Sequence, residues 1–128
     1  MIYIALVSAG MHILVALFQL CLACGAPWGE YAFGGQRRGV LPLAYRLASL
    51  FSLGLLLLFA AVNLHQAGMI HLGGFPTRAF AWITALYGIL GTFVNAISRS
   101  VKERRLWTPV VATLAILNSI LAWKIYAA

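Results

Sequence analysis

The chain has 128 residues, of which 63% are hydrophobic and only 9% are charged. Soluble domains are roughly 45–50% apolar and about 25% charged, so this composition excludes an ordinary soluble domain and predicts an integral membrane protein. The net charge of +7 does not indicate a nucleic-acid partner, because no basic helix or aromatic platform lies outside the apolar runs to bind a phosphate backbone. Anionic membrane lipids are the expected partners of these cations.

Four apolar runs are each long enough to cross a hydrocarbon core of about 30 Å at roughly 1.5 Å per residue. They cover residues 2–23, 40–64, 79–97 and 106–127. The connections between them are short, which leaves no room for a soluble domain. We therefore expect an all-α fold, with residues 1–128 forming a single transmembrane four-helix bundle.

The positions of the cations predict how the bundle is oriented. All nine Lys and Arg residues except Arg78 and Lys124 follow the first or the third run. The positive-inside rule places these two basic connections in the cytoplasm and both chain termini outside. Most tyrosines and tryptophans agree, since they fall near the ends of the runs, where amphipathic rings prefer to lie: Trp28, Tyr31, Tyr45 and Trp107 at the inner boundary, and Tyr3, Trp82, Trp123 and Tyr126 at the outer one.

The first run, 2–23, carries one polar face. Small and polar residues recur at three- and four-residue steps, so they share one side of a helix: Ala5, Ser8, His12, Ala16, Gln19 and Ala23. Unpaired polar side chains are costly in lipid, which predicts that this face turns inward with His12 near the midplane. His12 is either a proton carrier, ligand contact or metal ligand, or a neutral imidazole bonded to another helix. Interhelical polar contacts are common, which favours the structural role.

Cys21 and Cys24 form a C-x-x-C pattern at the inner end of the same run. This spacing can serve redox or metal chemistry. The inferred side of the membrane is reducing, however, and the chain has no other cysteine. We therefore expect both to behave as small hydrophobic residues.

The connection 25–42 is rich in glycine and in aromatic residues, among them Trp28. Aromatic side chains are costly to leave in water, so we expect this segment to fold back onto the inner end of the bundle. Glu30, one of only two acids, is expected to pair with Arg37, Arg38 or an arginine of the other basic connection. The lysine and hydroxyl that complete a phosphate-binding loop are missing.

The segment GAPWGEYAFGG, followed by a basic pair, Leu-Pro and an apolar run, resembles a group of short bacterial integral membrane proteins with four helices. A later motif of that group, an Asn before a basic Glu-Arg-x-x-Trp-x-Pro loop, corresponds here to Asn95, Ser98, Ser100, Glu103, Arg104, Trp107 and Pro109. The resemblance covers most of the chain, although Gln36, Arg37 and Arg38 stand where relatives have an aromatic and a proline. It implies a multi-pass protein of the bacterial inner membrane, and it implies no reaction or ligand.

The second run, 40–64, places Ser49 and Asn63 on one side of a helix. His65 and His71 follow in the outer connection, and two nearby histidines can suggest a metal site. No carboxylate or outward-facing cysteine is available to complete such a site. We therefore predict no metal and no other cofactor.

The third run, 79–97, has a stripe of small residues that would let another helix approach closely. This stripe, Thr84, Gly88 and Gly91, is a possible homodimer contact. Asn95 lies on the same face, and Asn118 in the fourth run lies at the depth expected for His12. The basic connection 98–105 is expected at the membrane surface, with Glu103 held by neighbouring arginines such as Arg104.

The predicted depths place His12 beside Asn118 and Gln19 beside Asn95. Together with Ser49, these residues would form one buried polar seam, for which three functions remain open. The seam could line a pocket or pathway for a small solute or lipid, or only order a structural or accessory subunit. The third alternative is an enzyme at the cytoplasmic surface that uses Glu30, Glu103 and nearby arginines.

The enzyme is the least favoured alternative, because the sequence shows no nucleophile with an adjacent base and both acids are expected in ion pairs. No acid lies inside a predicted span, which argues against a proton-coupled antiporter.

Overall fold

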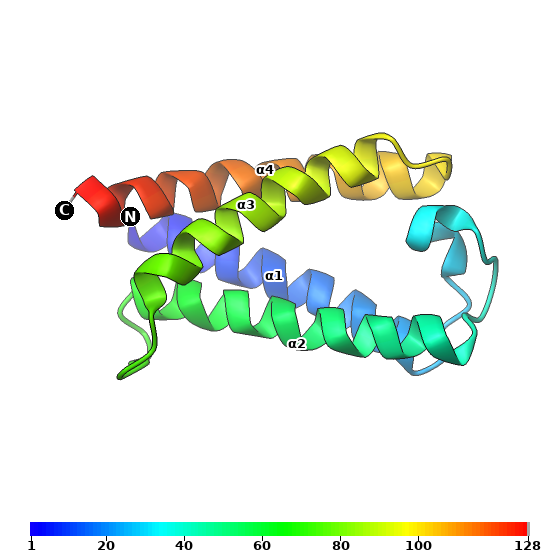
Figure 1. Ribbon diagram of the computed structural model, residues 1–128, viewed down its shortest axis with the longest axis horizontal. Coiled ribbons are helices and arrows are strands. Elements are labelled where there is room, and N and C mark those ends of the chain that lie inside the picture. Colours follow the sequence, from blue (N-terminus) through cyan, green and yellow to red (C-terminus); the bar gives the residue numbers. More distant parts are fainter. Residues whose placement is uncertain (128) are drawn as a thin grey trace.

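The computed structural model describes residues 1–127, and in this range the chain is helical with no strand (Figure 1). Four long helices, each long and apolar enough to cross a membrane, are joined by short connections that include two 3-10 turns. The elements are α1 (Ile2–Ala23), η1 (Gly29–Tyr31), η2 (Phe33–Gly35), α2 (Leu43–Gln66), α3 (Thr77–Ala96) and α4 (Val101–Ala127). The predicted all-α four-helix fold of a multi-pass membrane protein is confirmed.

The helices form two hairpins. α1 packs along α2 and α3 packs along α4, whereas contacts between the two hairpins are much sparser. Figure 1 shows α3 starting close to the end of α2 and diverging from it toward the opposite end of the bundle. We call the end with both chain termini the terminal end, and the end with the connections 24–42 and 97–100 the basic end.

The largest difference from the predicted spans is at the start of α4. The helix begins at Val101 because Ser100 caps it: the backbone N–H of Glu103 donates to Ser100 Oγ over 3.1 Å, and that of Arg104 donates to the Ser100 carbonyl over 2.9 Å. Serine is a preferred residue at this position. Hydropathy marks only the apolar part of a helix, and the first turns of α4 are basic. Most of the segment 98–105, which was expected to be a connection, therefore belongs to α4.

The small-residue stripe of α3 is used inside the chain. Thr84 and Gly88 are buried, and a Cβ atom added to Gly88 would lie 2.9 Å from the Cα atom of Ala115 in α4. Gly91 is partly exposed, and a Cβ atom there would have no neighbour within 4 Å. A homodimer through Thr84, Gly88 and Gly91 stays a prediction, but two of these three residues are already covered within the chain.

Candidate functional site

A chain of hydrogen bonds joins α1, α2 and α4. His12 Nδ1 lies 3.0 Å from Asn63 Oδ1, Asn63 Nδ2 donates to Asn118 Oδ1 over 2.9 Å, and Asn118 Nδ2 donates to Ser8 Oγ over 2.9 Å. All four side chains are buried. An amide oxygen only accepts hydrogen bonds, so the imidazole donates from Nδ1. This network satisfies its buried polar groups and ties the two hairpins together.

The network contains His12 and Asn118, as the seam prediction requires, but Asn63 stands between them. Sequence reasoning placed Asn63 on the same side of its helix as Ser49, at the outer end of the predicted span, and did not select it as a site residue. The helix continues to Gln66, whose Oε1 also accepts from Asn63 Nδ2 over 3.2 Å. The signal that could have found Asn63 was its position on the same face as Ser49.

The other expected seam contacts are not formed. Asn95 Nδ2 donates to the Gly91 carbonyl of its own helix over 2.8 Å, instead of meeting Gln19. Within residues 1–127, the buried atoms Gln19 Oε1 and Ser49 Oγ have no hydrogen-bond partner. Gln19 and Asn95 nevertheless line the same cavity, which Ser49 does not reach. The single predicted seam is therefore a hydrogen-bonded network and an adjoining cavity, and His12 belongs to both.

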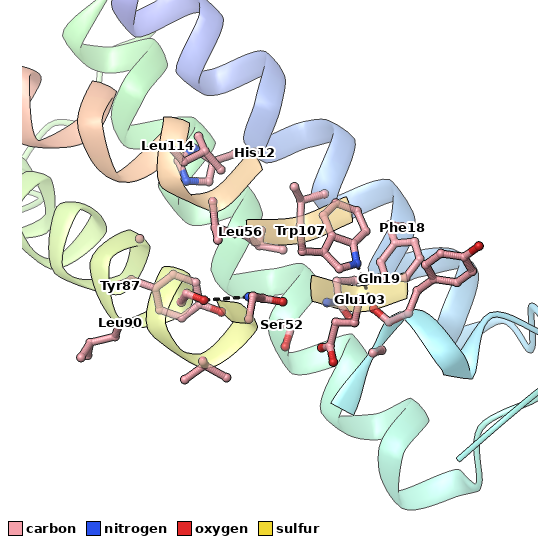
Figure 2. A pocket seen from close by; sticks show the side chains of 18 of the residues that line it. His12, Phe18, Gln19, Ser52, Leu56, Tyr87, Leu90, Glu103, Trp107 and Leu114 are labelled. Carbon is pink, nitrogen blue, oxygen red and sulfur yellow. Dashed lines mark hydrogen bonds between the residues drawn. The ribbon is translucent and has the colours of Figure 1, made fainter. Parts of the chain in front are cut away.

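The cavity has a volume of about 390 Å³ and lies between the two hairpins. Its wall is mostly apolar and aromatic, and it includes residues of all four helices and of the connection 24–42, several of them labelled in Figure 2. Polar groups on the wall come from His12, Gln19, Ser52, Asn95 and Glu103, among others. Because the hairpins touch over few residues, their divergence leaves this space between them.

The connection 24–42 covers the cavity at the basic end, with Tyr31 and Phe33 on the wall. Three hydrogen bonds fix it to the start of α4 or the residue before it. Trp107 Nε1–H donates to the Tyr31 carbonyl over 2.9 Å, Ser100 Oγ–H to the Glu30 carbonyl over 2.5 Å, and the backbone N–H of Gly34 to Glu103 Oε2 over 2.9 Å. The expectation that this segment folds back onto the bundle is confirmed.

Trp28, in the connection 24–42, also packs against the helices. Its ring stacks on Phe18 with a centroid distance of 6.1 Å, and Phe18 lies 4.6 Å from the ring of Trp107. Phe18 and Trp107 both line the cavity, and neither was predicted as a site residue. Aromatic residues at helix ends were interpreted as membrane-boundary anchors, which does not distinguish rings that face lipid from rings that face the interior.

Glu103 differs from its prediction. Its side chain is buried, and Oε2 accepts from Ser98 Oγ–H over 2.5 Å as well as from Gly34 N–H. Among residues 1–127 it forms no salt bridge, and Arg104 donates instead to the Ser98 carbonyl over 2.7 Å. The prediction that arginines hold Glu103 was therefore wrong, because the early start of α4 turns this side chain toward the interior. The capping pattern Ser100-x-x-Glu103 was the signal for that early start.

Glu30 pairs with Lys102 over 2.6 Å and not with Arg37, Arg38 or another arginine. The anchoring of its segment on α4 brings it next to the first turn of that helix. The hydrogen bond and the positive charge of Lys102 hold the pKa of Glu30 below its usual range. Arg37 and Arg38 are exposed.

Acidification should weaken this contact between the connection 24–42 and α4. Because the folded-state pKa of Glu30 is lowered, the stabilisation is fully present above the ordinary glutamate pKa of about 4.3 and is lost as the pH falls through the folded-state value. The pair is exposed, so we expect a small effect. Thermal unfolding at neutral and acidic pH should show a smaller pH dependence in Glu30→Gln than in the wild type. An unchanged dependence would contradict this role.

Within residues 1–127, no three His, Cys, Asp or Glu side chains lie together as a candidate metal site. His65 and His71 have ring centroids 5.8 Å apart, and Cys21 and Cys24 are free thiols.

No protein-family model, curated protein or solved structure matches this chain. Its function is therefore inferred from the geometry alone.

Proposed function

We propose that this multi-pass membrane protein binds a small lipid-like molecule in the cavity between its hairpins. The observation that carries the proposal is the cavity itself, with a volume of about 390 Å³ and an apolar and aromatic wall interrupted by a few polar groups. Small-molecule sites typically have volumes of roughly 300–1,000 Å³ and this kind of lining.

Entry from the bilayer, between α2 and α3, suits the geometry best. These helices contact each other over few residues, and the wall residues Leu90 and Val94 of α3 are 56% and 64% exposed. At the basic end, the connection 24–42 covers the cavity. An alkyl or acyl chain therefore fits the route better than a fully polar solute does.

The volume limits the size of the enclosed group. A water molecule occupies about 30 Å³ in the liquid, so a cavity of 390 Å³ holds roughly thirteen non-hydrogen atoms on that measure. An alkyl chain of about ten carbons with a small head group fits within this limit. The remainder of a longer lipid would extend between α2 and α3 into the bilayer.

A structural or accessory role is the second candidate, and the hydrogen-bond network supports it. His12, Asn63, Asn118 and Ser8 bind one another within the bundle, so His12 has a structural partner even though it also lines the cavity. The enzyme alternative has less support. Glu103 lines the cavity between the hairpins, whereas Glu30 lines a separate surface cavity with Lys102, so the two acids share no cleft.

We further propose that the basic end faces the cytoplasm, that both termini lie outside, and that the membrane is a bacterial inner membrane. The distribution of cations supports the orientation, and the resemblance to short bacterial membrane proteins supports the location. Membrane lipids are the expected partners, with a homodimer as a further possibility and with no nucleic acid.

Gly91→Leu tests the binding site. Gly91 lies on the cavity wall with open space beyond it, so a leucine side chain should fill the cavity without a clash. In a nonionic detergent with a sterol tail too large for the cavity, n-decanol at a hundred times its Kd should stabilise the wild type by about 2.7 kcal/mol. Gly91→Leu should lose most of this stabilisation in a thermal-shift titration.

Gly54→Leu is the matched control, because Gly54 in α2 is exposed, has no neighbour within 4 Å of an added Cβ atom and does not line the cavity. It should respond to n-decanol as the wild type does. An equal response of all three proteins would place the binding outside this cavity and overturn the proposal.

A further inference from the structure

The cavity contains one buried acid without a cationic partner. Glu103 is the only Asp or Glu on the wall, it is 8% exposed, and within residues 1–127 it forms no salt bridge. Ser98 Oγ accepts a hydrogen bond from the backbone N–H of Ser100 and donates its own proton to Glu103 Oε2, which also accepts from Gly34 N–H. Both hydrogen bonds thus converge on one oxygen of a buried acidic side chain, and no cation among residues 1–127 pairs with it.

A second acceptor lies at the same end of the cavity. Gln19 Oε1 is buried and has no hydrogen-bond partner among residues 1–127. In the view of Figure 2, Gln19 and Glu103 lie in the same part of the cavity as Phe18 and Trp107, whose ring centroids are 4.6 Å apart, and His12 lies toward the opposite end. Neither Lys nor Arg lines the cavity. Buried polar groups are expected to have partners, so this end calls for a group that donates hydrogen bonds.

The neighbouring aromatic rings favour a positive charge. Phe18 and Trp107 line this part of the cavity, and the Trp107 N–H is already bonded to the Tyr31 carbonyl, whereas the ring of Tyr31 already has Lys102 Nζ 5.7 Å from its centroid. The rings thus offer π faces and edges without a free indole donor. Cations close to aromatic faces are attracted by the ring quadrupole, more strongly where water is excluded.

We propose that the ligand is an amphiphile with a protonated amine head. Its ammonium group donates to the Glu103 carboxylate and to Gln19 Oε1, and its alkyl chain runs along the cavity toward His12. This inference rests on the proposed binding of a lipid-like molecule and names its chemical class. A carboxylate or phosphate head would meet Glu103 with no cation on the wall to offset the repulsion, whereas an ammonium compensates a buried charge.

Three ten-carbon probes with different heads test the proposal on the full-length protein at neutral pH. In titrations in the same sterol-tailed detergent, n-decylammonium should bind the wild type more tightly than n-decanol, and n-decanoate should bind most weakly. Glu103→Gln keeps the size of the side chain and an acceptor oxygen for Gly34. It should weaken n-decylammonium about ten- to a hundredfold, the range of a hydrogen bond to a charged group, and should weaken n-decanol less, so that the preference for the amine is lost.

Glu30→Gln is the matched control, since it neutralises the other acid of the chain, which lies outside this cavity. It should leave the preference for n-decylammonium unchanged. Retained n-decanol binding shows that Glu103→Gln is folded. If that variant does not fold, the order in which the three probes bind the wild type tests the amine assignment.

A further experiment compares short-chain phosphatidylethanolamine with phosphatidylglycerol. A preference for phosphatidylethanolamine identifies a lipid head group, instead of a free amine, as the source of the ammonium.

The results separate this inference from the proposed function. If the three probes bind the wild type equally, or if Glu103→Gln keeps the preference for n-decylammonium, the amine assignment is overturned and a lipid-like ligand stands. If no probe binds, the proposed function itself is overturned, and the amine assignment with it.

Discussion

Asn63→Leu should lower the free energy of unfolding by about 1–6 kcal/mol. Asn63 bonds to His12 of α1 and to Asn118 of α4, and interhelical hydrogen bonds in membranes are worth about 0.6 kcal/mol each on average, which sets the lower bound. The upper bound comes from the buried groups of His12 and Asn118 left without a partner, at roughly 1–3 kcal/mol each. Reversible unfolding in mixed micelles, followed by helical circular dichroism, measures the change.

Ser49→Ala provides the comparison for this prediction. Ser49 is as deeply buried as Asn63 in the same helix, but its hydroxyl has no partner among residues 1–127. Removing it should leave stability unchanged or slightly increased. Equal losses in Asn63→Leu and Ser49→Ala would show that burial alone, and not the network, determines what the polar residues of α2 contribute to stability.

Gly88→Ala should lower the free energy of unfolding by about 1–3 kcal/mol, the usual cost of overpacking. The added Cβ atom would lie 2.9 Å from Cα and 3.1 Å from N of Ala115, and these backbone atoms cannot rotate away. α3 and α4 would have to separate along their closest contact. The same unfolding measurement detects the loss.

Gly91→Ala makes the same change one turn further along α3, where the added atom has no neighbour within 4 Å. It should be neutral or stabilising by up to about 1 kcal/mol, because alanine is the better helix former. If Gly91→Ala were as destabilising as Gly88→Ala, the cause would be the glycine backbone in general and not the contact with α4.

The helices were predictable because hydrocarbon imposes their length and composition on the sequence itself. Their ends were less predictable, since they depend on local hydrogen bonds. α4 begins at Val101 through the cap of Ser100, and α2 begins after Pro42, whereas hydropathy alone started these spans at residues 106 and 40. The capping pattern was present in the sequence, but the basic residues around it were interpreted as a loop.

The candidate site was only partly predictable. Placing polar residues by depth brought His12 and Asn118 into one network, but depth cannot show how far one helix slides or rotates against another. For this reason Asn63 was not selected and the direct contact of Gln19 with Asn95 was expected. The buried position of Glu103 depends on how the connection 24–42 docks on α4, a long-range contact that has no periodic signal in the sequence.

The division into two hairpins has a consequence for biogenesis. α1 and α2 find most of their contacts in each other, so this pair can assemble while the ribosome is still adding α3. α4 is translated after the other three helices, and it carries Trp107 and Glu103, to which the earlier connection is bonded, as well as Asn118. We therefore expect the cavity to be walled by α4 and covered at the basic end only after translation of α4, so that a chain truncated before this helix lacks the enclosed space.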